Sequence, residues 1–376
     1  MKFIIEKNTL KNALDIVTHA TAGVTTSPIL ENILIKVNFQ NIVLASNNLE
    51  MAIECLITDN VKILSEWSFC VPAKLFSSYV SLIDEDEIEI ELLGNDNLQI
   101  KTKGGKTKIK WKDAQEFPLI PRIKEEVNIK MNGGILKKAI EKTLFSSAEG
   151  NIRPTLAGIY VNIQNNTASF ASTDSFRLTE YKAELSTSAE NSFAQIIPNK
   201  TAFEIKWIIK ENEEITIVSW ENQIGFFFND VKIYSRLLNG KFPDYDSANN
   251  KFFPTKFATK TEVNRFDLMQ ALKKINLISR ENNYSIKVSF SAENGILIET
   301  SQTQIGEGEI TISANVEWEN NIIGVNSTYF LEVLSVIETT HVQIGFETPL
   351  SPVLITPVDE KKGKAQFRHI IMPLKI

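Results

Sequence analysis

A short polar turn followed by three unlike side chains is the part of this sequence that most resembles a binding site. Residues 173–175 (Thr-Asp-Ser) can hydrogen-bond their own backbone in a turn, and Phe176, Arg177 and Leu178 follow directly. An aromatic ring, a guanidinium and an aliphatic side chain in succession could form the wall of a pocket. The flanking Thr, Phe and Tyr suit a half-buried strand, so the triplet could equally be an ordinary strand start.

The sequence contains no catalytic motif. The acidic runs at 84–87 and 211–214 each lie where a helix should give way to a strand, and we interpret them as solvated turns and not as general acid–base pairs. No G-x-x-x-x-G-K-S/T or G-x-G-x-x-G loop is present to bind a phosphate, and no G-x-S-x-G turn to present a nucleophile. We therefore expect no enzyme, and a binding or scaffold role comes first.

Cysteine and histidine are too sparse for a metal centre or a disulfide framework. Cys55 and Cys70 lack metal-site spacing, and His19, His341 and His369 are scattered singly. We expect no cofactor and no metal. We expect no signal peptide, because residues 1–7 contain a run of only three apolar residues before a Glu, and no apolar run approaches the roughly 20 residues that span a bilayer. The expectation is a cytoplasmic protein without a membrane partner.

Lysines concentrate on the segments that should be helical, although the chain as a whole is acidic, with a net charge of −6. If these helices share a face, that face could meet phosphates without reading a base sequence. Solvent-exposed lysines on the polar faces of ordinary amphipathic helices would give the same pattern. The candidates for facing DNA are Lys11, Lys74, Lys137, Lys138, Lys142, Lys200, Lys206, Lys210, Lys273 and Lys274.

Lysines also alternate with other residues along 106–112. Lys106, Lys108 and Lys110 would share one face of a strand, with Ile109 and Trp111 on the other, because strand side chains alternate at a period of two. A disordered DNA-binding tail would lack this alternation. An edge strand protected by lysines, or an interface with a partner, fits better.

The elements that must position these residues recur at an offset of 126 (136 − 10), which indicates an internal repeat. The repeated pairs are 10–14 with 136–140, 46–48 with 172–174, and 71–74 with 197–200. A third, more divergent copy begins at 268–272. Boundaries near 123–128 and 252–258 divide the chain into domains 1–125, 126–254 and 255–376.

Each copy has the order strand, helix, several strands, helix, several strands. This order predicts an α+β fold in which antiparallel sheet carries two helices on one face. In the first copy, hydrophobic alternation and turn residues predict strands at 32–39, 40–46, 50–56, 85–93, 98–103 and 106–111.

With the repeats, the helices and the turn in view, the whole chain resembles the beta subunit of bacterial DNA polymerase III, the beta sliding clamp family. The stretches that carry the resemblance are Ser-Pro-Ile-Leu-Glu-Asn at 27–32, Asn-Leu-Glu-Met at 48–51, Val-Pro-Ala-Lys at 71–74, Thr-Asp-Ser-Phe-Arg-Leu at 173–178, Gly-Lys-Phe-Pro-Asp-Tyr at 240–245, Pro-Leu-Ser-Pro-Val at 349–353 and Ile-Ile-Met-Pro-Leu at 370–374.

The resemblance implies a DNA clamp fold of three repeated domains, joined head to tail as a homodimeric ring. Such a contact must close to avoid filaments. The ring would encircle double-stranded DNA without sequence preference, so its affinity for phosphates can stay weak. The implied partners are the DNA polymerase III alpha subunit, the clamp loader and other proteins with a clamp-binding motif. The alternative is a divergent clamp-like scaffold that binds partner peptides without a replication role.

The family also has a hydrophobic pocket between its second and third domains, where clients dock a short peptide. Phe176 stands where the family usually has His, so the rim of this pocket should be more apolar. Matching by position, the pocket would comprise Arg153, Thr155, Leu156, Thr173, Ser175, Phe176, Arg177, Leu178, Pro243, Ala248, Tyr329, Leu350, Pro352, Ile370, Met372 and Leu374.

Subunit contacts are expected at the lysine-rich edge strand of the first domain and at an apolar pair in the third. The lysines could face Glu307 and Glu309 across this joint. The expected interface residues are Lys108, Ile109, Trp111, Leu277 and Ile278.

Overall fold

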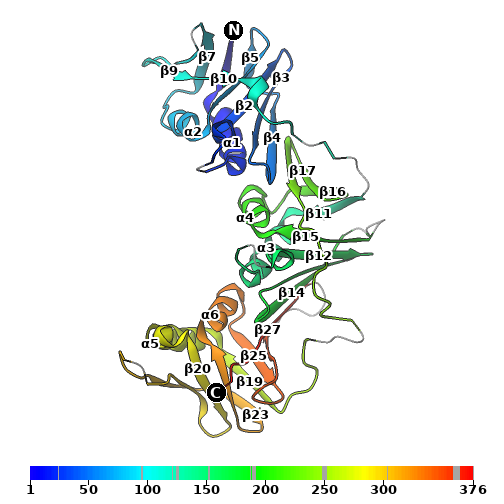
Figure 1. The fold of residues 1–376 in the computed structure, drawn as a ribbon, viewed down its shortest axis with the longest axis vertical. Helices are drawn as coiled ribbons and strands as arrows, with labels where there is room; N and C mark the ends of the chain where they lie inside the picture. Colours follow the sequence, from blue (N-terminus) through cyan, green and yellow to red (C-terminus); the bar gives the residue numbers. More distant parts are fainter. Residues whose placement is uncertain are drawn as a thin grey trace. The chain divides into compact units, whose positions relative to one another are not determined.

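The fold is described from a computed structural model, which covers residues 1–23, 25–94, 96–120, 122–123, 127–150, 153–186, 188, 192–247, 252–302, 304–358 and 365–375 (Figure 1). The chain packs as two compact units. The first comprises Met1–Gly133 and Trp207–Leu237, and the second comprises Gly134–Lys206 and Leu238–Ile376. The middle repeat expected from the sequence contributes to both units.

Six α-helices lie in the described residues, at the places where apolar residues recur with helical spacing. In the first helix Leu10, Ala13, Leu14 and Val17 are the buried residues. The helices are α1 (Lys7–Val17), α2 (Ala73–Ser81), α3 (Gly133–Thr143), α4 (Asn199–Ile208), α5 (Arg265–Ser279) and α6 (Ser327–Val336).

The first unit contains two sheets. In spatial order, the five-stranded sheet is β5 (Val61–Ile63), β1 (Lys2–Glu6), β7 (Glu87–Leu93), β8 (Asn97–Lys101) and β9 (Lys106–Lys110). The nine-stranded sheet is β10 (Lys112–Asp113), β6 (Trp67–Pro72), β2 (Asn32–Asn38), β3 (Asn41–Asn47), β4 (Met51–Ile57), β18 (Val231–Arg236), β17 (Gln223–Phe228), β16 (Glu214–Trp220) and β11 (Val127–Asn132).

The second unit repeats this arrangement with a nine-stranded and a four-stranded sheet. The larger is β15 (Phe193–Pro198), β12 (Gly158–Gln164), β13 (Thr167–Thr173), β14 (Arg177–Glu184), β27 (Ala365–Ile371), β26 (Val353–Pro357), β25 (His341–Phe346), β19 (Thr259–Asn264) and β23 (Asn315–Trp318). The smaller is β22 (Glu309–Ile312), β21 (Gly295–Glu299), β20 (Ser285–Ser291) and β24 (Asn321–Asn326).

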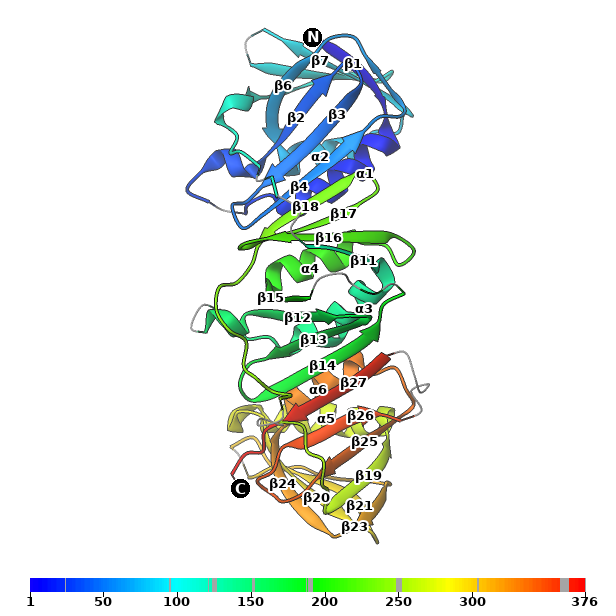
Figure 2. The same cartoon turned by 90° about the vertical axis from the view of Figure 1, so that its right-hand side faces the viewer.

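Helices cover one face of each nine-stranded sheet, as the α+β prediction requires. In the first unit α1 and α2 pack against each other behind β2, β3 and β4 in the view of Figure 2. In the second unit α5 and α6 pack together, with β25, β26 and β27 in front of them. The strand pairings are antiparallel. The predicted fold class is therefore confirmed.

Two strand pairings join segments that lie far apart in the sequence, and sequence reasoning missed both. In the first unit β4 pairs with β18, with Ala52 opposite Tyr234. In the second, β14 pairs with β27, with Leu178 opposite Ile370. Each pairing extends a short sheet into a nine-stranded one and places the end of one repeat beside the turn of another.

Candidate functional site

The turn between β13 and β14 is built by its own side chains, as its residue types predict. Thr173 Oγ1 donates to the Arg177 carbonyl at 2.6 Å and accepts from the Ser175 amide at 3.1 Å. Asp174 Oδ1 accepts from the amides of Phe176 and Arg177 at 2.9 and 3.1 Å. Thr173 therefore shapes the turn from a buried position, and Phe176 projects from it with 58% of its surface exposed.

Arg177 lies inside the protein, only 7% exposed, and does not form an open pocket wall. Its Nε donates to Asp174 Oδ2 at 2.9 Å and its Nη2 to the Phe145 carbonyl at 2.7 Å, while Nη1 pairs with Glu332 of α6. The guanidinium carbon lies 4.4 Å from the centre of the Tyr329 ring, a cation–π distance. Arg177 thus joins the turn to α6. This corrects the expectation that it lines the pocket.

The sequence alone assigned no role to Glu332, an acidic residue of α6. The signal that could have revealed its role is Arg177 itself, since a guanidinium between the apolar Phe176 and Leu178 needs acceptors when it is buried. Neither partner could be identified from spacing, because Phe145 and Glu332 are distant from Arg177 in the chain.

A buried polar chain lies next to Arg177. Ser146 Oγ and Thr179 Oγ1 share a hydrogen bond, and Thr179 Oγ1 lies 2.7 Å from His369 Nδ1. His369 is fully buried, and its Nε2 has no partner among the described residues. Burial, with the Arg177 charge as a lesser cause, lowers the pKa of His369 well below its usual range. The imidazole is therefore neutral at physiological pH.

Apolar residues meet where the end of β27 lies beside the backbone of Phe176. The Met372 amide donates to the Phe176 carbonyl at 2.8 Å, and the Met372 side chain is 37% exposed. Leu178 and Ile370, which pair directly, are 5% and 1% exposed and belong to one buried cluster. The buried Leu178 and Ile370 each lie two residues from an exposed apolar side chain, Phe176 or Met372, and this combination suits an apolar anchor residue of a peptide.

The chain before β26 adds to this rim. Val353, the first residue of β26, pairs with Ile371, so residues 350–352 lead toward the same end of the sheet. Leu350 is 70% exposed and Pro352 half-buried. Leu374 is bound by its amide to the Gly324 carbonyl at 2.7 Å.

A second short segment approaches the turn from residues 153–156. Arg153 Nη1 donates to Ser175 Oγ at 2.5 Å, and Leu156 is buried. A Cβ on Gly240 would lie 2.4 Å from Thr155 Cγ2, and Gly240 has φ +123°. Only glycine suits this close approach with a positive φ.

The segment that follows Gly240 is held by aromatic rings. Phe242 stacks on Tyr160 with centroids 4.9 Å apart, and it packs edge-on against Tyr245. The Tyr245 hydroxyl donates to Glu180 at 2.9 Å. Burial raises the pKa of Tyr245. Pro243 is exposed beside these rings. Ala248, predicted as a pocket residue, lies outside the described residues.

The lysines predicted to face DNA divide into different environments. Lys142 is 5% exposed; it binds the Val336 carbonyl and lies 3.0 Å from Glu338. Its hydrogen bond lowers the pKa of Glu338. Lys142 is therefore a packing residue in the second unit and cannot reach a phosphate, which corrects the prediction. Lys138 also pairs with Glu338, at 3.2 Å, but stays exposed. Lys210 follows the end of α4 and is not on the helix.

The other predicted lysines remain on described helices. Lys11 pairs with Asp15 one turn along α1 at 2.9 Å. The exposed members are Lys74, Lys273, Lys274 and Lys200, the last on the first turn of α4. The half-buried members are Lys137 and Lys206.

The lysine-rich strand has the predicted alternation and position. Along β9 the lysines are exposed, Thr107 is half-buried and Ile109 is buried, and β9 is the edge of its sheet. Ile109 is only 5% exposed, so its side chain packs inside its own unit and is not free for a partner, which corrects that expectation. Trp111 is half-buried. In the second unit Leu277 is 75% exposed, and β22 is likewise a sheet edge.

Within the described ranges, no helix combines the length and apolarity needed to cross a membrane. The same residues hold no cluster of three or more His, Cys, Asp or Glu side chains that could bind a metal ion.

Three family models match the chain in succession. They describe the N-terminal, central and C-terminal domains of the DNA polymerase III beta subunit and match residues 1–121, 130–244 and 250–375. The beta sliding clamp of Bacillus subtilis is 30% identical over 370 residues, covering 96% of this chain and 97% of that protein. That of Halalkalibacterium halodurans is 28% identical over 386 residues, with both chains covered fully. The crystal structure of a Bacillus subtilis DNA polymerase sliding clamp superimposes with a TM-score of 0.92 at 28% identity, covering 100% of this chain and 99% of that one. The chain therefore belongs to the DNA polymerase III beta subunit family, the bacterial beta sliding clamps.

Proposed function

We propose that this chain is a replicative processivity factor that closes as a head-to-tail homodimeric ring around duplex DNA and tethers the polymerase to it. The observation that carries the proposal is the match of all three clamp domain models, in order, along one chain. The domains would be 1–125, 126–254 and 255–376. The chain itself would perform no chemistry; ATP hydrolysis would belong to the clamp loader, in the cytoplasm.

The proposed contact with DNA is diffuse. Exposed lysines on α2 and α5, such as Lys74, Lys273 and Lys274, would lie among phosphates without reading bases. A net charge of −6 is compatible with this role, because a ring is retained by topology and gains little from tight binding. A sliding protein also benefits from weak contacts, since strong ones would hold it in place.

Client proteins, among them the polymerase alpha subunit and the clamp loader, would dock a peptide on the apolar floor formed by Leu178 and Ile370. Phe176, Leu350 and Met372 are exposed around it, and exposed apolar side chains gathered at one place mark interaction sites. Arg177 would act from behind, by holding the turn against α6.

The subunit joint would bring the β9 edge of one chain to the β22 edge of another. Unpaired strand edges are ready to pair with a second chain. Lys108 on β9 and Glu309 on β22 are both exposed, so the two edges carry opposite charge. Leu277 would add apolar contact beside β22.

The test is topological. The protein would be loaded by its cognate loader onto nicked circular DNA and then followed by gel filtration before and after a restriction enzyme linearises the circle. We expect retention on the circle and loss from the linear form. Retention on linear DNA would contradict the proposal. A mass of about 85 kDa, twice the 42.4 kDa of one chain, is expected in solution, and a stable monomer would count against the ring.

A further inference from the structure

The turn between β3 and β4 in the first unit reproduces the turn of the proposed client pocket, 126 residues earlier. Leu49 and Ser175 occupy the same place with positive φ angles of 72° and 84°. The Leu49 amide donates to Asn47 Oδ1 at 2.8 Å, as the Ser175 amide donates to Thr173 Oγ1 at 3.1 Å. The shared backbone geometry shows that the two turns are structural equivalents.

The neighbouring strand is equivalent as well. The Arg236 amide donates to the Glu50 carbonyl at 3.1 Å, and the Met372 amide donates to the Phe176 carbonyl at 2.8 Å. The pairing of β4 with β18 therefore matches the pairing of β14 with β27. Arg236 stands in the place of Met372.

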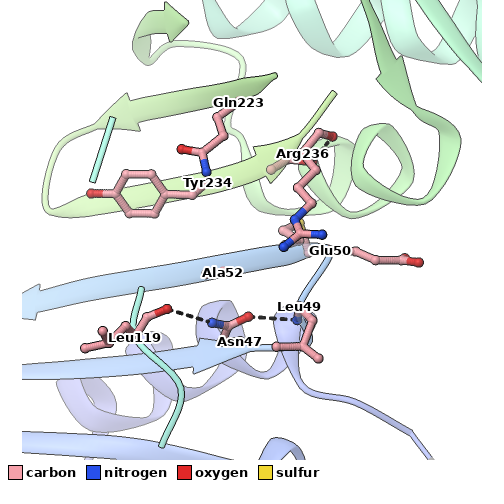
Figure 3. Close-up of a pocket in the computed structure, with 10 residues that line it drawn as sticks. Asn47, Leu49, Glu50, Ala52, Leu119, Gln223, Tyr234 and Arg236 are labelled. Atoms are coloured by element: carbon pink, nitrogen blue, oxygen red, sulfur yellow. Dashed lines mark hydrogen bonds between the residues drawn. The ribbon is translucent and has the colours of Figure 1, made fainter. Parts of the chain in front are cut away.

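The first unit has a small hollow at this equivalent position (Figure 3), with a volume of about 90 Å³. Ala52 lines it where the second unit has the larger Leu178. The Asn47 side chain holds one wall by donating to the Leu119 carbonyl at 3.4 Å. The volume equals that of about three water molecules, which suits the four carbons of one leucine side chain.

The rim of the hollow is both apolar and cationic. Leu49 and Leu119 are 55% and 94% exposed. Arg236 is exposed, and its guanidinium has no ion pair with any residue that the structure describes. In Figure 3 its side chain extends from β18 toward the turn that carries Leu49 and Glu50. A carboxylate beside an aliphatic anchor would meet this guanidinium in a charge-assisted hydrogen bond.

We propose that this hollow is a second docking site on each chain, for an extended peptide that carries a leucine-sized anchor next to a carboxylate. The inference rests on the proposed function, because the occupant belongs to the same class of client peptide. At the first-unit site Glu50 replaces the aromatic Phe176, and Arg236 replaces Met372. This site therefore binds more weakly than the pocket around Met372 and has a stronger requirement for an acidic residue in the peptide.

The methionines make the two sites separately observable. Of the five in the chain, Met51 lines the hollow and Met372 stands at the proposed client pocket. The protein, labelled with carbon-13 on its methionine methyl groups, would be titrated with the peptide acetyl-Gly-Leu-Asp-Leu-Gly-amide and followed by NMR. Acetyl-Gly-Ala-Asn-Ala-Gly-amide is the control peptide, and Met131 and Met269 are internal references.

We expect both the Met51 and Met372 signals to shift along separate saturation curves. The Met51 curve should report the lower affinity. A shift of Met372 alone would leave the client pocket standing and overturn the second site. A shift of Met51 alone would support the second site and contradict the client pocket. If neither signal moves, both sites are overturned.

Two exposed substitutions test the recognition chemistry. Arg236→Glu and Leu119→Ser should each weaken binding at Met51 by about tenfold or more, and both should leave the Met372 curve unchanged. Lys232→Glu, an exposed change on the same strand, is the matched control and should leave both curves unchanged. An unchanged Met51 curve in Arg236→Glu would refute the proposed role of the guanidinium.

Discussion

Arg177→Ala should destabilise the second unit, because the guanidinium is the buried connection between the turn and α6. The substitution removes the guanidinium donor from Asp174 Oδ2 and from the Phe145 carbonyl. Breaking a buried ion pair costs about 3–5 kcal/mol. The side chain of Glu332 is 40% exposed and can regain water, so the lower end of this range applies, about 3 kcal/mol.

Differential scanning calorimetry measures this loss. Each kcal/mol lowers the melting temperature of a unit of this size by about 2–4 °C, so the transition should fall by about 6–12 °C. Arg177→Lys keeps the charge but loses the planar fork, and about half the loss is expected. Arg153→Ala is the matched control. Arg153 donates to the same turn but is exposed, so its loss should cost less than about 1 kcal/mol.

The reasoning would be refuted if Arg177→Ala melted within about 1 °C of Arg153→Ala. A double-mutant cycle with Glu332→Gln adds a second criterion. Residues in direct contact show coupling energies of about 0.5–3 kcal/mol, and a coupling near zero would mean that the Arg177–Glu332 pair contributes nothing.

Three further predictions follow from other residues. Below pH ~6.5 the free energy of unfolding should fall by up to about 1.4 kcal/mol per pH unit, because the unfolded chain takes up a proton that buried His369 does not. Urea denaturation at a series of pH values measures this dependence, and His369→Gln should lose it. An unchanged pH dependence in His369→Gln would exclude His369 as its source. Lys108→Glu or high salt should weaken the dimer in analytical ultracentrifugation, whereas Lys36→Glu, an exposed change on a central strand, should not. If neither Lys108→Glu nor high salt weakens the dimer more than Lys36→Glu does, the proposed charge pairing between subunits is wrong. Lys273→Glu should make the slope of log binding constant against log salt concentration for DNA shallower by about one unit. Lys142→Met should leave that slope unchanged and lower the thermal stability, since Lys142 is buried against Glu338. A shallower slope in Lys142→Met would contradict the burial of Lys142.

Much of the fold was readable from local patterns. Six strands of the first repeat, from 32–39 to 106–111, were predicted close to their observed bounds, because each depends on residues near one another in sequence. The alternation along β9 and its place at a sheet edge followed from the spacing of its lysines.

The candidate site was only partly predictable. Residue type and order identified the turn at 173–175 and the Phe176-Arg177-Leu178 triplet that follows it, and the structure brings Leu178, Ile370 and Met372 together beside Phe176. Side-chain direction was not readable. Arg177 points inward to Glu332, and Ile109 points into its own core, because burial depends on which distant element packs against a residue.

The sequence alone determined the repeat, the α+β class, the turn chemistry and the family, because these lie in local residue types and their order. Only the tertiary structure decided the pairings of β4 with β18 and of β14 with β27, which join strands across repeats. Those pairings place Met372 beside Phe176 and Arg236 beside Glu50. Every strand edge presents the same backbone N–H and C=O groups, so packing of the side chains decides which strands pair. The pairing cannot be predicted from the strand sequences alone.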